Sequence, residues 1–364
     1  MQGAPWKGEG VGGPARAGSS IIEFQAGAPH RGALNGLDVK HQRILVLGGG
    51  GFIGRYVVDR LAARVASVVV PTRRRDRIKS LIVLPTAEVI DADVHDPVVL
   101  GRLVSDCDAV INLIAILQGD YPPAPRAPYG SEFLQVHVEL PRRIVAACER
   151  YGVRRLLHVS ALGADPKGPS MYLRSKGDGE RIAQSSSVVE TTVVRPSIVF
   201  GREDRFLNLF ARMARWVPLM AIGRPDARLQ PVWVADVASA IVNALDNVET
   251  YGRTYELCGP RIYTLRELIQ FATRAAGHPR PVVGLPDPVA RMMAWIFEHL
   301  PGEPVMSRDN LDSLKIDSVA SRQPYWPAPE LGIHPTPMEP EAVLYLAGLH
   351  PRTRFGGFRA RARR

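Results

Sequence analysis

The sequence has few cysteines, and none of the spacing that a disulfide framework or a zinc site requires. Its three cysteines, Cys107, Cys148 and Cys258, are far apart, and each lies in apolar sequence. Disulfide frameworks and zinc sites use more cysteines at short, repeated spacings. The sequence therefore predicts no metal site and three buried thiols in a reducing compartment.

The sequence also lacks a long apolar run. A spanning helix needs about 18 consecutive apolar residues, whereas the longest candidate is the short stretch 110–117. Residues 1–41 are rich in Gly, Ala and Pro and lack the continuous apolar core of a secretory signal. We expect a disordered extension there, and a cytoplasmic protein that does not cross a membrane.

Positive charge exceeds negative charge, with a formal net charge of +10. Anionic partners such as nucleotides, acidic lipids or nucleic acid are electrostatically compatible with this balance. Six arginines and no acids lie in 352–364, and a solvated basic tail over 341–364 is favoured over a phosphate- or lipid-binding surface. Neither basic end shows the interleaved aromatics of a base-stacking surface, so no specific nucleic-acid binding is expected.

Short β-branched runs alternate with amphipathic stretches from residue 42 to residue 200. This pattern predicts an α/β fold, a Rossmann-type doubly wound parallel sheet with helices on both faces and ligand at the carboxyl ends of the strands. The expected strands are Ile44–Leu47, Val68–Val70, Glu88–Ile90, Ala109–Leu113, Arg155–Val159 and Thr192–Val194. The expected helices are Ile53–Ala63, Glu132–Tyr151 and Tyr172–Ala183.

A smaller C-terminal α/β lobe, interleaved with the sheet, is expected over 201–340, where the alternation fades. Helices are predicted at Asp236–Asn247, Thr264–Ala276 and Pro288–Leu300. The last of these gathers apolar residues from Val289 to Leu300 on one face. Packing into the core of this lobe is favoured over a membrane or partner surface as the reason.

A glycine-rich turn joins the first strand to the first helix. The residues Gly48-Gly49-Gly50-Gly51-Phe52-Ile53-Gly54 place glycines at positions 48, 51 and 54. The first permits a tight turn, the second lets backbone N–H groups approach a pyrophosphate, and the third lets helix and strand pack closely. At the first strand–helix junction of an alternating domain, this spacing predicts a dinucleotide site that includes Gly50, Phe52 and Ile53.

The residues after the second and third strands bear on which dinucleotide is bound. An NAD site commonly has a carboxylate after the second strand, for the ribose hydroxyls, but this chain has Arg73-Arg74-Arg75. A guanidinium at Arg73 can bind a 2′-phosphate, which favours NADP(H) over NAD(H), and an arginine-rich helix start that faces solvent is the alternative role of these residues. Asp93 and Val94 are expected beside the adenine, although Asp93 has local loop capping as an alternative role.

A tyrosine and a lysine lie four residues apart at the start of the third expected helix. The spacing puts Tyr172 and Lys176 on one face, where the ammonium is expected to lower the phenol pKa and to hold the nicotinamide ribose. A surface pair is the alternative. Asn112, with the following Leu113, Ile114 and Ala115, is expected along the cofactor, with satisfaction of local backbone groups as the competing role.

Taken together, these motifs resemble the extended short-chain dehydrogenase superfamily of epimerases and dehydratases. The residues that carry the resemblance are the glycine turn, Tyr172 with Lys176, and the stretches 195–201 and 232–238. A narrower similarity is to the atypical branch that contains the NAD(P)H-binding accessory subunit of respiratory complex I and its bacterial homologues. It rests on 71–75, 158–164, 171–180 and 307–313.

The resemblance implies a tightly held NADPH and a role beside respiratory complex I or in ubiquinone metabolism, peripheral to the inner face of the energy-conserving membrane. It adds Pro196 to the cofactor contacts. Active members keep a Ser or Thr just past the fifth strand to polarise the substrate carbonyl. Here Ser160 ends that strand, and Leu162 lies two residues later. Two alternatives remain open. Ser160, Tyr172 and Lys176 form a shifted catalytic triad, or Leu162 occupies the Ser/Thr position and the site is a cofactor cradle without that hydroxyl.

Two hypotheses follow. The chain is either an NADP(H)-binding protein with a structural or regulatory role near respiratory or quinone-biosynthesis proteins, or an active NAD(P)-dependent reductase, epimerase or dehydratase with Tyr172 as acid or base. Whether it is an enzyme is left open by the sequence.

Exchange of Arg73 for Asp is expected to shift the preference from NADPH toward NADH, because a carboxylate accepts hydrogen bonds from the ribose hydroxyls and repels a 2′-phosphate. Titration of both nucleotides into both proteins measures the shift. Equal affinities before and after the exchange would contradict our interpretation of Arg73.

Overall fold

The computed structural model describes residues 41–119, 127–301, 304–321 and 328–347. The predicted disordered extension lies outside the described residues except for residue 41, and so do residues 348–364 of the predicted basic tail. Residues 341–346 belong instead to a helix, α12 (Met338–Leu346), which begins before the predicted boundary of the tail.

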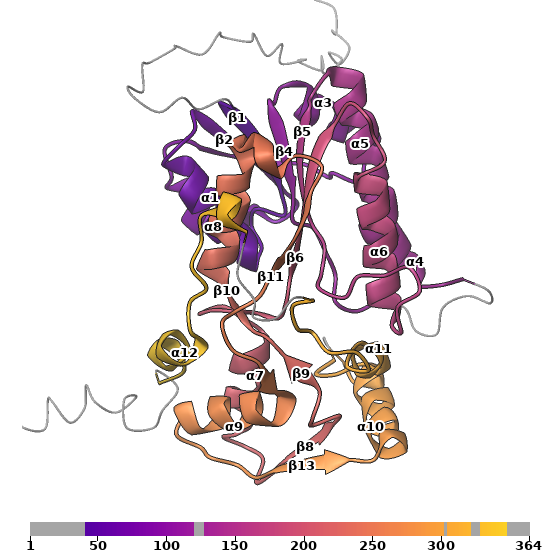
Figure 1. Cartoon of the computed structure of the whole chain (residues 1–364), viewed down its shortest axis with the longest axis vertical. Helices are drawn as coiled ribbons and strands as arrows, with labels where there is room; N and C mark the ends of the chain where they lie inside the picture. Colours follow the sequence, from indigo (N-terminus) through magenta and orange to yellow (C-terminus); the bar gives the residue numbers. More distant parts are fainter. Residues whose placement is uncertain (1–40, 120–126, 302–303, 322–327, 348–364) are drawn as a thin grey trace, which may run out of the picture. The chain divides into compact units, whose positions relative to one another are not determined.

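A seven-stranded parallel sheet lies at the centre of the larger part of the chain (Figure 1). Its strand order is β11-β6-β5-β4-β1-β2-β3, as predicted for a doubly wound fold. The order reverses between β1 and β4, which is where such sheets bind ligands. The strands are β1 (Arg43–Leu47), β2 (Ser67–Thr72), β3 (Ala87–Asp91), β4 (Ala109–Asn112), β5 (Arg155–Val159), β6 (Glu190–Pro196) and β11 (Thr254–Leu257).

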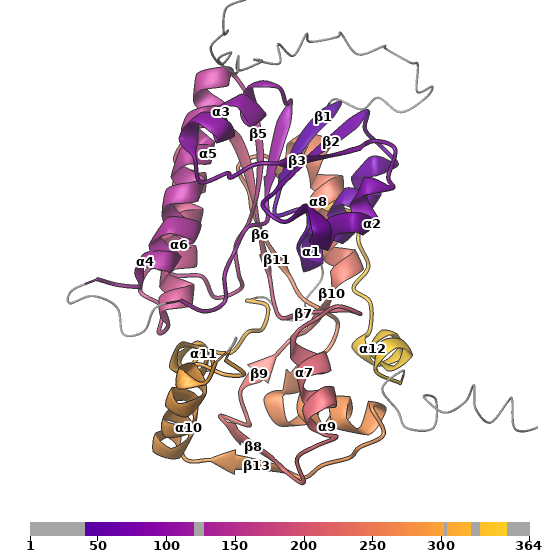
Figure 2. The same cartoon turned by 180° about the vertical axis from the view of Figure 1, so that it is seen from behind.

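Helices cover both faces of this sheet, as the opposite views of Figures 1 and 2 show. On one face lie α1 (Phe52–Ala62) and α8 (Val234–Asp246), which pack against each other. On the other lie α3 (Pro97–Ser105), α5 (Leu140–Tyr151) and α6 (Met171–Ala183). Two apolar clusters, one under each layer, bury the sheet. The short helices α2 (Lys79–Ile82) and α4 (Ser131–Phe133) complete this part.

The helix expected at Glu132–Tyr151 contains a π-helical segment that the sequence pattern did not reveal. It runs from α4 through this segment, Leu134–Glu139, into α5. The backbone of this segment lies directly against α6. The approach is possible because residue 179 is glycine, since a Cβ there would overlap the carbonyl oxygen of His137. π-Bulges are frequent at functional sites, and this one lies beside the helix that carries Tyr172.

The smaller lobe has its own apolar core, built mainly from α7 (Phe206–Met213), α9 (Leu265–Ala275) and α12. Its remaining helices are α10 (Asp287–His299) and α11 (Arg308–Ser313). Its short strands are β8 (Met220–Gly223), β9 (Arg228–Leu229), β12 (Tyr263–Thr264) and β13 (Val282–Leu285), while β7 (Val199–Phe200) pairs with β10 (Val232–Trp233). Although both lie within 201–340, β11 is an edge strand of the large sheet and α8 packs on one face of that sheet, so the chain interleaves the two parts.

The expectation that α10 packs its apolar face into the lobe is wrong. The helix is buried only at Ala290 and Ala294. Met292, Trp295 and Leu300 are 59%, 48% and 54% exposed. Ala290 and Ala294 lie on the side of the helix that faces β8 and α11, Met293 and Phe297 are half-buried, and the other large apolar side chains of the helix are exposed.

The three cysteines are free and buried, as predicted. Among the described residues, no helix combines the length and the apolar character needed to cross a bilayer.

Arg155, at the start of β5, is the largest fully buried side chain of the described residues. Its guanidinium donates to the carbonyl oxygens of Ala244 and Leu245 at the end of α8, and to that of Glu190 on β6. Its charge also lies 4.2 Å from the ring centroid of Tyr251. Burial lowers the pKa of Arg155 to about 10, which leaves it charged at neutral pH. A cation therefore joins the sheet to the carboxyl end of α8, where the helix dipole favours it.

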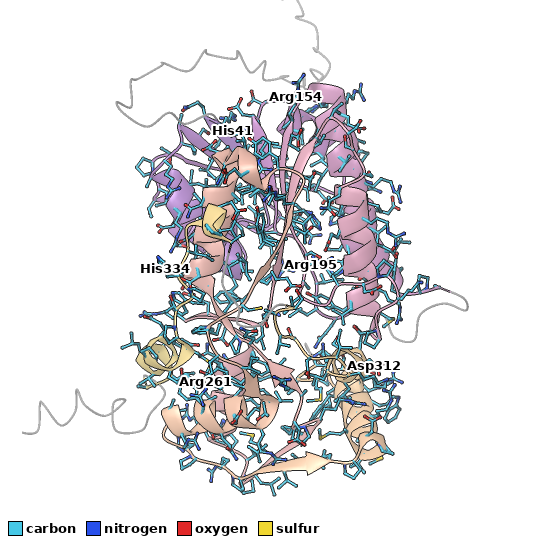
Figure 3. All side chains as sticks on the ribbon, in the orientation of Figure 1. His41, Arg154, Arg195, Arg261, Asp312 and His334 are labelled. Carbon is cyan, nitrogen blue, oxygen red and sulfur yellow. The ribbon has the colours of Figure 1, made fainter. Side chains whose placement is uncertain are left out.

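Exchange of Arg155 for Met is expected to lower the free energy of unfolding by about 2–4 kcal/mol, because three carbonyl groups lose a charged donor inside the protein. The neighbouring Arg154 is exposed and is labelled in Figure 3. Its exchange for Met is the matched control and is expected to change stability by less than about 0.5 kcal/mol. Urea unfolding of both variants measures the difference, and equal losses would contradict this account of Arg155.

Candidate dinucleotide-binding site

The predicted site residues come from segments that end at one edge of the large sheet. Strands β1, β4, β5 and β6 are parallel neighbours, so their carboxyl ends lie together. The glycine turn follows β1, Asn112 ends β4, Ser160 follows β5 and Pro196 ends β6. Tyr172 and Lys176 enter from α6.

The glycine turn depends on the backbone conformation of Gly48 and leaves no space for a side chain at Gly50 or Gly54. Gly48 has a φ of +82°, a conformation that glycine adopts without strain. The N–H of Gly51 donates to the oxygen of Gly48 at 2.9 Å, which closes the turn. A Cβ on Gly54 would overlap that same oxygen, and one on Gly50 would overlap the side chain of Ile78.

The amino end of α1 offers its backbone donors to a ligand. Gly51 is the N-cap residue, has no side chain to cap the helix, and is followed by no acidic residue in the first turn. The first N–H groups of a helix have no partner within the helix, and its dipole favours an anion there. Phe52 and Ile53 begin the helix, and Ile53 packs against the buried cluster beneath it. This arrangement suits a pyrophosphate.

Asn112 satisfies local groups and also joins a buried polar pair. Its Oδ1 accepts from the N–H of Ile114 at 3.2 Å, and its Nδ2 lies 3.2 Å from Nδ1 of His158. Burial, together with the nearby Lys176, lowers the pKa of His158 to about 3, so the ring is neutral and Nδ1 can accept. The turn is fixed beside Gly48, since a Cβ on Gly48 would lie 3.2 Å from the Ile114 side chain. Leu113 and Ala115 belong to this turn, with Ala115 exposed.

Ser160 and Leu162 have different surroundings. The Oγ of Ser160 is buried and, among the described residues, has no hydrogen-bond partner. Leu162 is buried against Cys258 and Ala320. A buried hydroxyl without a partner costs free energy unless a ligand or water bonds to it. Ser160 is therefore the residue of this pair that can bond to a bound molecule.

Lys176 and Tyr172 do not form the activated pair that the spacing suggests. Lys176 is buried, and its Nζ donates to the carbonyl oxygen of Val159 at 2.7 Å. Burial lowers the pKa of Lys176 to about 8. Burial also raises the pKa of Tyr172 to about 12. The expected lowering of the phenol pKa by the ammonium is wrong for this arrangement, because desolvation is the cause that acts on the phenol.

His137 is a residue of the site that the sequence did not indicate. Its Nε2 accepts from the N–H of Ile116 at 3.1 Å, so its proton lies on Nδ1, 2.8 Å from Oγ of Ser175. That Oγ donates to the carbonyl oxygen of Tyr172. The pKa of His137 lies well below its usual value, mainly because the ring is buried and also because Lys176 and His158 lie nearby. The neutral ring packs edge-on against the Tyr172 ring and so holds the tyrosine in place.

Asp309, in α11 of the smaller lobe, caps the helix that carries Tyr172. Its Oδ1 accepts from the N–H of Met171 at 2.6 Å, and its Oδ2 accepts from the N–H of Tyr172 at 3.1 Å. Ser313 donates to Ser170, the N-cap residue of the same helix. A carboxylate at a helix amino end is favourable. Asp309 belongs to the stretch 307–313 that carried the narrower resemblance, which was the only signal for it.

The residues predicted for the adenosine end lie after β2 and β3. Arg73, Arg74 and Arg75 are exposed. Asp93 is exposed, and its Oδ1 accepts from the N–H of His95 at 3.0 Å, so it makes the loop contact that was its alternative role. The side chain of Val94 is buried in the core. The roles of Arg73, Asp93 and Val94 toward a dinucleotide stay predictions.

Residues 44–258 match the model of the NAD dependent epimerase/dehydratase family, which covers more than half of the chain. The chain belongs to this family. Among solved epimerases, UDP-glucose 4-epimerase from Thermotoga maritima with UDP-glucose has 19% sequence identity and a TM-score of 0.60 over 84% of this chain and 97% of its own. At that identity the likeness shows the fold alone.

Two relatives of this epimerase/dehydratase-family chain are named as mitochondrial subunits of an NADH dehydrogenase and an NADH-ubiquinone oxidoreductase. The mouse protein "NADH dehydrogenase [ubiquinone] 1 alpha subcomplex subunit 9, mitochondrial" is 34% identical over 309 residues, which are 82% of this chain and 78% of its own. The Neurospora crassa "NADH-ubiquinone oxidoreductase 40 kDa subunit, mitochondrial" is 32% identical over 300 residues, which are 82% of this chain and 75% of its own.

Membership in the epimerase/dehydratase family implies a nicotinamide dinucleotide, NAD or NADP, as ligand, and the residues present fit one. Side chains at Gly50 or Gly54 would clash with their neighbours, the amino end of α1 has no acidic residue, and the Oγ of Ser160 has no partner within the described chain.

Exchange of Lys176 for Met is expected to change how stability depends on pH. The pKa of Lys176 is about 8 in the folded protein and 10.5 ordinarily, so between these values the unfolded chain binds more protons and the wild type gains stability as pH rises. The stability of the wild type relative to the variant should thus grow by up to about 3 kcal/mol from pH 7 to pH 10.5. Urea unfolding of both nucleotide-free proteins measures this difference, and no change with pH would contradict the burial of a charged lysine.

Proposed function

We propose that this protein holds NADP(H) as a structural or regulatory cofactor and serves as an accessory subunit or assembly factor of respiratory complex I, or in ubiquinone metabolism. The relatives named as complex I subunits support the place of action. The exposed Arg73 supports NADP(H) over NAD(H), because a free guanidinium after β2 can bind a 2′-phosphate.

The contacts of Lys176 and Leu162 carry the noncatalytic part of the proposal, and the pKa of Tyr172 agrees with them. The phenol of Tyr172 has a pKa near 12, raised by burial. A general acid or base works best with a pKa near the operating pH, and this value lies well above neutrality. The other members of the constellation point the same way, because Lys176 bonds to the backbone of β5 and Leu162 faces an apolar cluster.

The alternative function, an active reductase, epimerase or dehydratase, has one observation in its favour. Tyr172 and Lys176 are both present on α6 at the carboxyl edge of the sheet, one helical turn apart. In that case Tyr172 is the acid or base, with Ser160 beside the substrate oxygen and Lys176 as the electrostatic partner.

The proposed location is the inner face of an energy-conserving membrane, where the protein associates peripherally. The subunits named above support an association with a respiratory enzyme, and the net charge of +10 is favourable beside an anionic surface. Partner proteins from complex I or from quinone biosynthesis are part of the same proposal.

Exchange of Tyr172 for Phe separates the two functions. We expect the wild type and this variant to retain the same nucleotide, and neither to oxidise it with quinones or carbonyl compounds. The Gly54→Ala protein, in which a Cβ overlaps the turn, should lose the nucleotide and is the control for binding. Mass spectrometry of the bound nucleotide and absorbance of reduced nicotinamide are the measurements. Oxidation by one class of compound in the wild type but not in Y172F would establish the enzyme instead.

A further inference from the structure

A small surface pocket in the smaller lobe is lined by two arginines. It has a volume of about 240 Å³ and lies between the carboxyl end of α9 and the start of β13, with Gln270, Arg274, Pro279, Arg280 and Pro281 as its walls. Figures 1 and 2 show α7 beside α9 at this end of the lobe. Pockets for drug-sized ligands have about 300–1,000 Å³, so this pocket suits a small chemical group.

The backbone that carries the pocket has little conformational freedom. Gly277, with a φ of +77°, follows the end of α9, which is a usual way to end a helix. Pro279 and Pro281 flank Arg280 and fix φ on both sides of it. The carbonyl oxygen of Pro281 accepts from the N–H of Met220, the first residue of β8, at 2.9 Å. The turn before β13 is thus tied to the segment before β8.

The two guanidinium groups have hydrogen-bond donors to spare. Nε of Arg280 donates to the carbonyl oxygen of Ala214, the C-cap residue of α7, at 2.8 Å. This bond orients the half-buried side chain, and its two Nη groups make no hydrogen bond to the described chain. Arg274, one helical turn after Gln270 on α9, is exposed and has no hydrogen bond or ion pair with the described residues. Donors from two different elements therefore remain available to a ligand at one pocket.

The other arginines in this part of the chain pair with carboxylates. Within the described residues of 220–321, seven arginines have a carboxylate oxygen at 3.8 Å or less, namely Arg224, Arg228, Arg253, Arg261, Arg266, Arg291 and Arg308. Arg274 and Arg280 are the two that have none there. The stretch 268–286 around them contains no acidic residue. Two cations without a counter-charge give the pocket a positive potential that attracts an anion.

Exposed apolar side chains lie next to these arginines in the same tied segments. Trp216, two residues after Ala214, is 82% exposed, and Leu219, just before β8, is 45% exposed. Arg215 is exposed as well, and its guanidinium lies 5.9 Å from the ring centroid of Trp216. A ligand that joins a phosphate to an apolar part can therefore contact both kinds of side chain.

We infer that Arg274 and Arg280 bind a phosphate group, carried either by an anionic phospholipid or by a small soluble phosphate compound. Guanidinium groups bind phosphate oxygens through charge-assisted, often bidentate hydrogen bonds. A planar carboxylate is satisfied by one guanidinium, whereas a tetrahedral phosphate has oxygens for two that approach from different elements. The site is separate from the dinucleotide site, because its residues belong to α9 and to the turn before β13, so the inference does not rest on the proposed function.

Titration calorimetry of inorganic phosphate into the full chain is the first arm of the test, with NADPH in excess to occupy the amino end of α1. Arg274→Gln should weaken phosphate binding about tenfold or more, because a charge-assisted hydrogen bond is lost. This variant keeps every printed contact of the described chain. The double variant R274Q with R280Q should bind more weakly still.

The matched control is Arg154→Gln, which removes one charge from an exposed position of the large part of the chain (Figure 3). It should bind phosphate as the wild type does. R154Q and R274Q have the same net charge, so a difference between them comes from the pocket and not from the general attraction of a basic protein to anions.

Co-sedimentation with vesicles of phosphatidylcholine, with and without phosphatidylglycerol, is the second arm and identifies the source of the phosphate. Binding to the phosphatidylglycerol vesicles that R274Q weakens relative to R154Q assigns the pocket to a lipid headgroup. Binding of inorganic phosphate that R274Q weakens, without such an effect on vesicles, assigns it to a soluble phosphate compound. Either result supports the inference.

Two results would overturn it. In the first, the wild type binds neither inorganic phosphate nor the phosphatidylglycerol vesicles. In the second, R274Q and the double variant bind both as tightly as R154Q does. NADPH retention is measured in the same samples, and a wild type that holds no nucleotide contradicts the dinucleotide proposal while the comparison of R274Q with R154Q keeps its meaning.

Discussion

The close approach of α1 to the end of β1 is the contact on which the rest of the site depends. It exists because Gly54 has no Cβ to meet the carbonyl oxygen of Gly48. This contact fixes the amino end of α1 over the point where the strand order reverses, between β1 and β4. The turn after β4 then packs against Gly48. The amino end of α1 and a buried polar edge of the sheet are thus brought together because Gly54 has no Cβ.

Burial and local contacts surround the motif residue Tyr172, and they support the proposed role of the site as a cofactor cradle. The ring of Tyr172 packs against Phe133 and His137, and Asp309 of the smaller lobe caps its helix. Each contact immobilises the tyrosine, and desolvation raises the pKa of its phenol. The same features make the site rigid, which suits a cofactor that stays bound.

The sequence predicted the sheet and its carboxyl edge because local signals determine both. β-Branched runs define the strands, and the glycine spacing at 48, 51 and 54 defines the turn. His137 was missed because its role depends on a π-helical segment and on contact with α6, neither of which leaves a periodic pattern. Asp309 lies 137 residues from Tyr172, so no local rule connects them. The burial of α10 was predicted wrongly, because periodicity shows that a face is apolar but not whether the chain itself covers it.

We propose above all that the glycine turn and its neighbours hold a nicotinamide dinucleotide tightly enough for it to stay bound during purification. The most direct measurement is mass spectrometry of the nucleotide released from the protein on denaturation, after purification without added nucleotide. We expect about one NADP(H) for each chain. Protein that carries no nucleotide, and that binds neither NADPH nor NADH when they are added, would contradict it.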